Sequence, residues 1–132
     1  YINIIRGFNA LLIAVVYLDR ACIKIDDETF ETNGLQFKVP VEWQKMIEGF
    51  ATRAIEEIVD ERARLRISMV PISLVVLRTW VYLGNGMSPC VIYHVVKKVV
   101  NAMGMEIKEM KMLGEEYVVV KKEMKREMKI KT

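Results

Sequence analysis

An Asn-Gly dipeptide at positions 33–34 limits the fold of this chain more than any other local feature. It lies in the middle of residues 29–39, where apolar and polar side chains alternate. A two-residue type I′ turn needs positive φ angles at both central positions, and Asn and Gly tolerate them. The segment is therefore predicted to form a β-hairpin, with Phe30 opposite Phe37 on one face.

After Pro40 the spacing of the apolar residues changes from two to three or four, which is typical of a helix. A helix is predicted over residues 41–64. A second helix is predicted over residues 88–103, because Ser88 is a good N-cap and a proline occupies the first helical position. Gly104 then supplies the glycine that commonly ends a helix.

Residues 72–83 fit two different structures. Their apolar residues fall at helical spacing, but the segment is also rich in Val, Thr, Trp and Tyr, which favours a strand. Residues 65–70 are a further candidate strand, ended by a proline. Two more strands are predicted over residues 105–113 and 116–125.

The fold class predicted from this pattern is α+β, with residues 1–132 forming a single domain. We expect an antiparallel sheet packed by two main helices, 41–64 and 88–103. The favoured arrangement is a ferredoxin-like order, which requires residues 72–83 to be a strand. If they are a helix instead, the C-terminal half has the order of a winged helix.

Charge is distributed unevenly along the chain. Residues 62–104 hold six basic side chains and no Asp or Glu, although the whole chain holds 17 acidic residues. Such a segment has a positive potential and attracts anions, nucleic acid among them. Residues 62–104 are therefore the candidate segment for binding DNA or RNA. The alternative is that the segment lacks acidic residues because most of it is core.

The two cysteines, Cys22 and Cys90, are too few and too far apart to define a disulfide framework or a zinc motif. They are predicted to be small core residues in a reducing, cytoplasmic compartment. Cys90 and His94 stand four residues apart on the predicted helix, so they would form half of a metal site if Cys22 folded close by. Packing is the favoured role, and no metal, cofactor or catalytic residue is predicted.

Two other clusters have a chemical and a structural interpretation. Carboxylates gather on the helix 41–64, and a solvated helix face is predicted there because no glycine loop or inward-facing histidine accompanies them: Glu56, Glu57, Asp60 and Glu61. Residues 84–88 would form a phosphate-binding loop only if a strand precedes them. The loop matches neither the dinucleotide fingerprint nor the P-loop, so a tight turn is predicted.

The order helix, glycine turn, helix and hairpin in the C-terminal half resembles the winged helix-turn-helix family. Ser88-Pro89, Tyr93, Lys97-Lys98 and Gly104 are similar to the recognition helix of winged-helix repressors, although six Val or Ile residues leave this helix only a narrow polar strip. The resemblance implies groove-facing and wing residues: Ser88, Tyr93, His94, Lys97 and Asn101 on the helix, and Lys108 and Lys111 on the wing. The acid-free segment adds four cations: Arg64, Arg66, Arg78 and Lys98.

The predicted function is a non-enzymatic nucleic-acid-binding or regulatory domain. The alternative is a structural or assembly subunit that forms a homo-oligomer through the apolar residues 10–18. An enzyme ranks last, because a chain with one histidine offers few partners for acid–base catalysis. Residues 1–18 fall short of the roughly 20 apolar residues that span a bilayer, so no membrane span is predicted. The Lys, Glu, Ile and Val content resembles that of thermophilic proteins.

Overall fold

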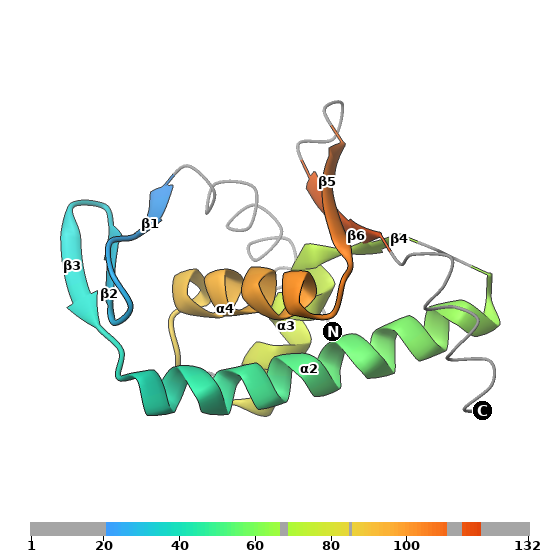
Figure 1. Cartoon of the computed structure of the whole chain (residues 1–132), viewed down its shortest axis with the longest axis horizontal. Coiled ribbons are helices and arrows are strands. Elements are labelled where there is room, and N and C mark those ends of the chain that lie inside the picture. The colour runs from blue at the N-terminus through green and yellow to red at the C-terminus, as the bar shows by residue number, and fades with distance from the viewer. Residues whose placement is uncertain (1–20, 67–68, 85, 111–114, 120–132) are drawn as a thin grey trace, which may run out of the picture.

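Three helices form the centre of the described structure, with a small sheet toward each end (Figure 1). The computed structural model describes residues 21–66, 69–84, 86–110 and 115–119. Its helices are α2 (Val41–Arg64), α3 (Ile72–Tyr82) and α4 (Pro89–Ala102). Among these residues the strands form two antiparallel three-stranded sheets. The predicted α+β class is confirmed.

The first sheet contains the predicted hairpin. Its strands pair in the order in which they occur: β1 (Cys22–Lys24), β2 (Thr29–Thr32) and β3 (Leu35–Lys38). Phe30 pairs with Phe37 as expected, and their ring centroids lie 6.0 Å apart. Asn33 and Gly34 take φ angles of 53° and 78°, the left-handed values that the type I′ turn requires. The prediction for this segment is confirmed, including its register.

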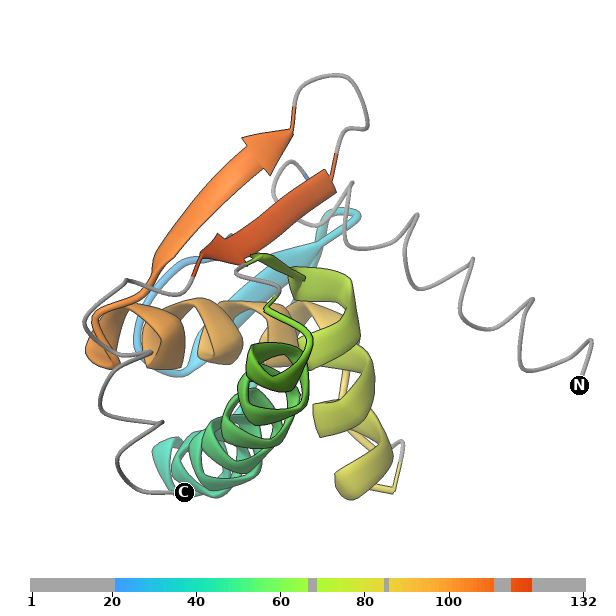
Figure 2. The ribbon, with the colours of Figure 1, turned by 90° about the vertical axis from the view of Figure 1, so that its right-hand side faces the viewer.

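The second sheet joins a short strand from the middle of the chain to the C-terminal hairpin. Its strands are β4 (Met69–Pro71), β5 (Glu106–Met110) and β6 (Glu115–Val119), and β6 lies between the other two. Val70 pairs with Val118, and both are buried. Figure 2 shows β5 and β6 side by side on the α4 side of the helices, with β4 leading into α3.

Residues 72–82 are helical, and the ferredoxin-like order is not confirmed. Ile72, Val75, Val76 and Thr79 are all buried, which is the spacing of one helix face. The Thr79 hydroxyl donates to the Val75 carbonyl oxygen at 2.8 Å, so this strand-favouring residue is accommodated inside the helix. Burial of this face outweighs the β propensity of the individual residues. The described strands therefore form two separate sheets and not one ferredoxin-like sheet.

A side-chain cap positions α4, and side-chain hydrogen bonds to the preceding sheet position α2. The Ser88 hydroxyl accepts a hydrogen bond from the Cys90 amide at 3.3 Å, and Gly104 has a φ of +75° after the last turn of α4. Both predicted ends of α4 are confirmed to within about a residue. At the start of α2, the buried Gln44 side chain donates to the carbonyl oxygens of Asp27 (2.6 Å) and Val39 (3.0 Å). These two bonds fasten the first sheet to α2.

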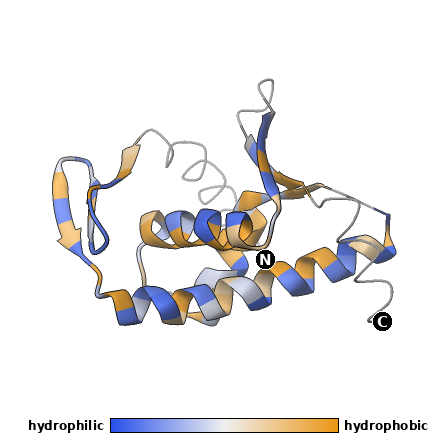
Figure 3. Ribbon diagram, viewed as in Figure 1, coloured by the Kyte–Doolittle hydropathy of each residue, from blue (hydrophilic) through white to orange (hydrophobic). Residues whose placement is uncertain are grey.

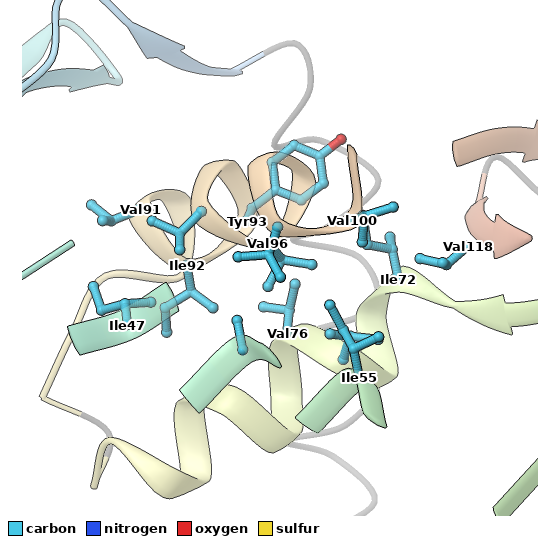
Figure 4. Close-up of a cluster of buried hydrophobic side chains, with 14 of the residues drawn as sticks. Ile47, Ile55, Ile72, Val76, Val91, Ile92, Tyr93, Val96, Val100 and Val118 are labelled. Carbon is cyan, nitrogen blue, oxygen red and sulfur yellow. The ribbon is translucent and has the colours of Figure 1, made fainter. Parts of the chain in front are cut away.

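The core lies between the three helices and extends under the second sheet (Figure 4). Ile55 of α2, Val76 of α3 and Val96 of α4 are fully buried and lie close together there. Figure 3 shows hydrophobic and hydrophilic residues alternating along α2, as expected of a helix with one buried face. Burying three such faces is the main source of stability for helices of this length.

Several predictions concern residues outside the described ranges. They include the apolar run 10–18, Lys111 and the part of the last predicted strand beyond Val119. Within the ranges that the structure describes, no helix is long and apolar enough to cross a membrane.

Candidate functional site

The outer side of α4 is a narrow polar strip. Lys98 and Asn101 are exposed and Lys97 is half-buried, whereas eight residues of the helix are buried. The Lys97 ammonium lies 5.1 Å from the centroid of the Tyr93 ring, a cation–π distance. Lys98 reaches Glu48 of α2, with 2.7 Å between Nζ and Oε1. The polar side chains of the strip are therefore two lysines and an asparagine, and Lys98 pairs with a carboxylate of α2.

Three other predicted cations lie at neighbouring elements. Lys108 is exposed on β5, the strand that follows α4. Arg64 and Arg66 are exposed at the end of α2, and Arg64 is 3.5 Å from Asp60 within the same helix. The partner of Arg64 is the one expected from its i,i+4 spacing. These side chains belong to the solvent-facing surface, as the nucleic-acid prediction requires.

Two predicted groove residues, Tyr93 and Ser88, and the predicted cation Arg78 have partners within the fold, and the prediction that Tyr93 faces a groove is wrong. Tyr93 is fully buried and its hydroxyl is hydrogen-bonded to Glu116 of β6. The Ser88 hydroxyl is occupied as the cap of α4. Arg78 points to α2, where it lies 3.1 Å from Glu61. The sequence could not predict these orientations. The partner of Tyr93 and that of Arg78 lie on other elements, and Ser88 caps the end of its own helix.

The carboxylates of α2 form a network with α3. Glu57 is hydrogen-bonded to the Tyr82 hydroxyl, pairs with Arg53 at 2.9 Å and lies 3.6 Å from Arg78. The Tyr82 hydrogen bond, followed by Arg53, lowers the pKa of Glu57, and the same bond to Glu57 raises the pKa of Tyr82. The Arg53 guanidinium also lies 4.7 Å from the Tyr82 ring centroid. The predicted solvated face is thus partly a contact between two helices, and three of its four carboxylates pair with arginines: Glu57, Asp60 and Glu61.

The two cysteines meet, although they lie 68 residues apart in sequence. Cys22 of β1 and Cys90 of α4 are joined by a disulfide with a Cα–Cα distance of 5.7 Å, within the usual range for such bonds. Both are buried, as predicted for core residues. The prediction that they do not pair is wrong. Their proximity follows from the docking of the first sheet on α4, which no local spacing encodes.

His94 completes this cluster. One ligand atom each from Cys22, Cys90 and His94 lie within 4.8 Å of one another. The His94 Nε2 is 3.2 Å from the Cys22 carbonyl oxygen, and its ring centroid is 5.9 Å from that of Phe30. The imidazole therefore faces the first sheet and not an open groove, contrary to its predicted role. Its proximity to Cys90 is the i,i+4 relation seen in the sequence.

The Gly84–Ser88 segment connects two helices. Gly84 has a φ of +72° and follows the last turn of α3. A strand before the glycines was the condition for a phosphate-binding loop, and α3 occupies that position. The tight-turn interpretation fits this arrangement.

Comparison of the chain with protein-family models, with curated proteins and with solved structures finds no match. Two groups of residues therefore remain as candidate sites on geometry alone. One is the polar strip of α4 with Lys108, and the other is the cluster of Cys22, Cys90 and His94.

Proposed function

We propose that this chain is a non-enzymatic nucleic-acid-binding or regulatory domain of the winged-helix type. The observation that carries the proposal is the element order α2, β4, α3, α4, β5, β6, together with the sheet order β4-β6-β5. When the chain is compared with a winged helix, α3 and α4 correspond to the helix-turn-helix. Helix α4 is then the recognition helix, and the hairpin β5-β6 is the wing. A cytoplasmic location belongs to the same proposal, and the Cys22–Cys90 disulfide would be open to reduction there.

The proposed contact surface is the polar strip of α4 and the cations beside it. Lys97, Lys98 and Asn101 lie within one helical turn of each other, and α4 holds no acidic residue. Lys108 on β5 and Arg66 after α2 are exposed cations. Flexible cations of this kind contact phosphates, which gives affinity without selecting a sequence. Because Tyr93 is buried, we propose binding that depends mainly on the phosphate backbone.

Fluorescence anisotropy with labelled duplex and single-stranded oligonucleotides tests this function. For roughly four phosphate contacts, a plot of log K against log salt for duplex DNA has a slope of about −3 to −4. Lys97→Ala and Lys108→Ala should each weaken binding to all sequences and reduce the magnitude of the slope by about 1. Lys38→Ala on β3 is the matched control, since this exposed lysine lies outside the proposed surface. Absence of binding at low salt, or equal loss in the control, would contradict the proposal.

Self-association is a second candidate function. It is favoured by two exposed apolar side chains on α2, Trp43 (54% exposed) and Met46 (50% exposed), which lie three residues apart. The partner we propose is a second copy of the chain, because residues 1–61 hold eleven acidic and six basic side chains and residues 62–104 hold no acid. Such asymmetry favours head-to-tail contact between protomers.

Light scattering across a range of protein concentrations tests the second candidate. The double variant Trp43→Ala/Met46→Ala should shift the chain toward the monomer. Val81→Ala is a suitable control, because Val81 is an equally exposed apolar residue (59%) on another helix. A wild-type chain that stays monomeric at high concentration would exclude this function.

A further inference from the structure

We propose that Cys22, Cys90 and His94 form, when the disulfide is reduced, a binding site for a thiolate-preferring divalent cation such as zinc. The three ligand atoms lie within 4.8 Å of one another. Donors around a tetrahedral zinc ion lie about 3.5–3.8 Å apart, given zinc–sulfur and zinc–nitrogen bonds of about 2.3 and 2.0 Å. Reduction frees the two sulfur atoms to rotate about their side-chain bonds toward that spacing, and the three residues are already close enough for it.

The three side chains are held in place by the fold and not by a flexible loop. Cys90 lies in the first turn of α4, where Ser88 caps the helix, and His94 follows one turn later on the same side. Cys22 belongs to β1, where it pairs with Thr32 of β2. Two ligands therefore come from one helix and the third from the sheet that packs against it. A pre-positioned set of this kind loses little conformational freedom when it binds a metal.

The chemical nature of the set selects the metal. Thiolate sulfur and imidazole nitrogen are the preferred ligands of zinc, whereas calcium and magnesium take oxygen ligands. Cys22 and Cys90 are 3% and 2% exposed, so their thiolates would be shielded from water, and the cation would offset their negative charge. His94 is partly exposed, which leaves a side from which a metal can enter. Among the described residues the cluster has three protein ligands, and the fourth position would hold water.

The oxidised and the metal-bound forms are alternatives at the same place. Reduction by a dithiol transfers two electrons to the Cys22–Cys90 bond, yielding two thiols on the protein and a disulfide on the reductant. Binding of the divalent cation then releases the two thiol protons, while His94 binds as the neutral imidazole. In both forms the first sheet stays attached to α4. The inference does not depend on the proposed nucleic-acid function.

Cobalt titration of the full chain, reduced with dithiothreitol, freed of the reductant by gel filtration and kept under argon, tests the inference. We expect one Co²⁺ per chain, with the near-ultraviolet charge-transfer absorption of cobalt–thiolate bonds, and displacement of this absorption by Zn²⁺. The oxidised chain should bind neither ion at this site. Thiol counting before the titration establishes that both cysteines are reduced.

Variants separate this site from adventitious binding by thiols. His94→Phe keeps an aromatic ring against Phe30 but removes the nitrogen, and Cys22→Ser removes one thiolate. Loss of a residue that only supports a metal ligand typically weakens metal binding by roughly 10- to 100-fold. Each of these two variants loses a ligand itself, so each should weaken cobalt binding by at least that factor. Tyr93→Phe is the matched control, since it alters the neighbouring residue while keeping its ring beside His94, and it should bind as the wild type does.

Two results would overturn the inference. One is a reduced wild-type chain that binds no cobalt or zinc, which would leave a structural disulfide only. The other is His94→Phe binding as tightly as the wild type, which would reduce the site to a pair of thiols. Circular dichroism of each reduced variant establishes that it is folded, and metal release by a chelator provides a second measure of affinity if the absorption is weak.

Discussion

The two three-stranded sheets differ in how far apart along the sequence their strands lie. The first sheet is complete within residues 22–38, and each of its strands pairs with the next. The second pairs residues 69–71 with residues 117–119, and α3 and α4 lie between these two segments in the sequence. Local pairing loses less chain entropy, because a short loop closes at lower cost. Sequence patterns can therefore define the pairing of β2 with β3 more readily than the pairing of β4 with β6.

The two sheets also differ in how they are attached to the helices. In the second sheet, Val70 and Val118 are buried parts of the central core. The first sheet supplies Cys22 and Phe30 to the same core, but it packs on the helices mainly through β2 against α4, whereas β4, β5 and β6 each pack on a helix. The Cys22–Cys90 disulfide and the hydrogen bonds of Gln44 complete the attachment of the first sheet. A unit attached by few contacts can open at a lower free energy than the core does. We therefore expect the first sheet to detach before the second unfolds.

Truncation of Phe30 gives the largest expected effect. Phe30 is fully buried, so Phe30→Ala should lower the free energy of opening of the first sheet by about 3–5 kcal/mol. Hydrogen exchange of the backbone amides in both sheets measures this, and the second sheet should lose less protection. Leu35→Ala in the same sheet is the control, because Leu35 is 72% exposed. Equal loss of protection in the two sheets would show that they unfold as one unit.

Reduction of the disulfide is the next largest change. A cross-link between residues 68 apart typically stabilises a fold by about 2–4 kcal/mol. The reduced chain, with a chelator present to remove metal, should therefore unfold at lower denaturant concentration, and the first sheet should lose most protection. The double variant Cys22→Ala/Cys90→Ala is the control, since the reductant should not change its stability. If reduction leaves the first sheet as protected as before, Phe30 and Gln44 alone hold it.

What the sequence predicts follows the same division between local and long-range contacts. The hairpin register, the two long helices and the cap at Ser88 depend on neighbours in sequence, and they are confirmed. The segment 72–83 stayed ambiguous because its β-favouring residues also lie at helical spacing. Only packing against α2 and α4 decides in favour of the helix.

The candidate sites were predicted only where the residues share one element. The Cys90–His94 spacing was recognisable because both residues are on α4, whereas the third member, Cys22, is brought in by the docking of β1. Tyr93 was expected in the groove, but its hydroxyl is bound to Glu116, 23 residues further along the chain. The position of Cys22 and the orientation of Tyr93 both depend on which elements pack together. The periodicity of residues within one element does not predict that packing.

A smaller effect is expected at the turn of the first hairpin. Gly34 has a φ of +78°, where a side chain costs about 1–2 kcal/mol, so Gly34→Ala should destabilise the first sheet by that amount. Gly49→Ala is the matched control: Gly49 lies inside α2 and an added Cβ meets no atom within 4 Å, so it should stabilise by about 0.5–1 kcal/mol. Denaturant unfolding of both variants measures the two changes. If both substitutions changed the free energy of unfolding in the same direction, the turn conformation at Gly34 would not determine the stability of the first sheet.

The smallest effect concerns Asp26, in the turn between β1 and β2. Its Oδ1 accepts hydrogen bonds from the backbone amides of Glu28 (2.9 Å) and Thr29 (2.7 Å). The bond from the Glu28 amide, followed by hydrogen bonding from the Thr29 side chain and amide, holds the pKa of Asp26 below its ordinary value of 3.8. With a lowered pKa, the folded chain binds fewer protons than the unfolded chain, so stability decreases as the pH falls. The contribution is complete above pH 3.8 and disappears as the pH falls through the folded-state pKa.

Asp26→Asn isolates this charge, because an asparagine oxygen still accepts the same two amide hydrogen bonds. The variant should be slightly less stable than the wild type at neutral pH, and the difference should vanish in strong acid. Unfolding curves at a series of pH values measure it, together with the titration shifts of the Glu28 and Thr29 amides. Asp27→Asn is the control, since Asp27 takes part through its backbone carbonyl, which accepts from Gln44. A pH-independent difference would mean that the charge of Asp26 does not stabilise the turn.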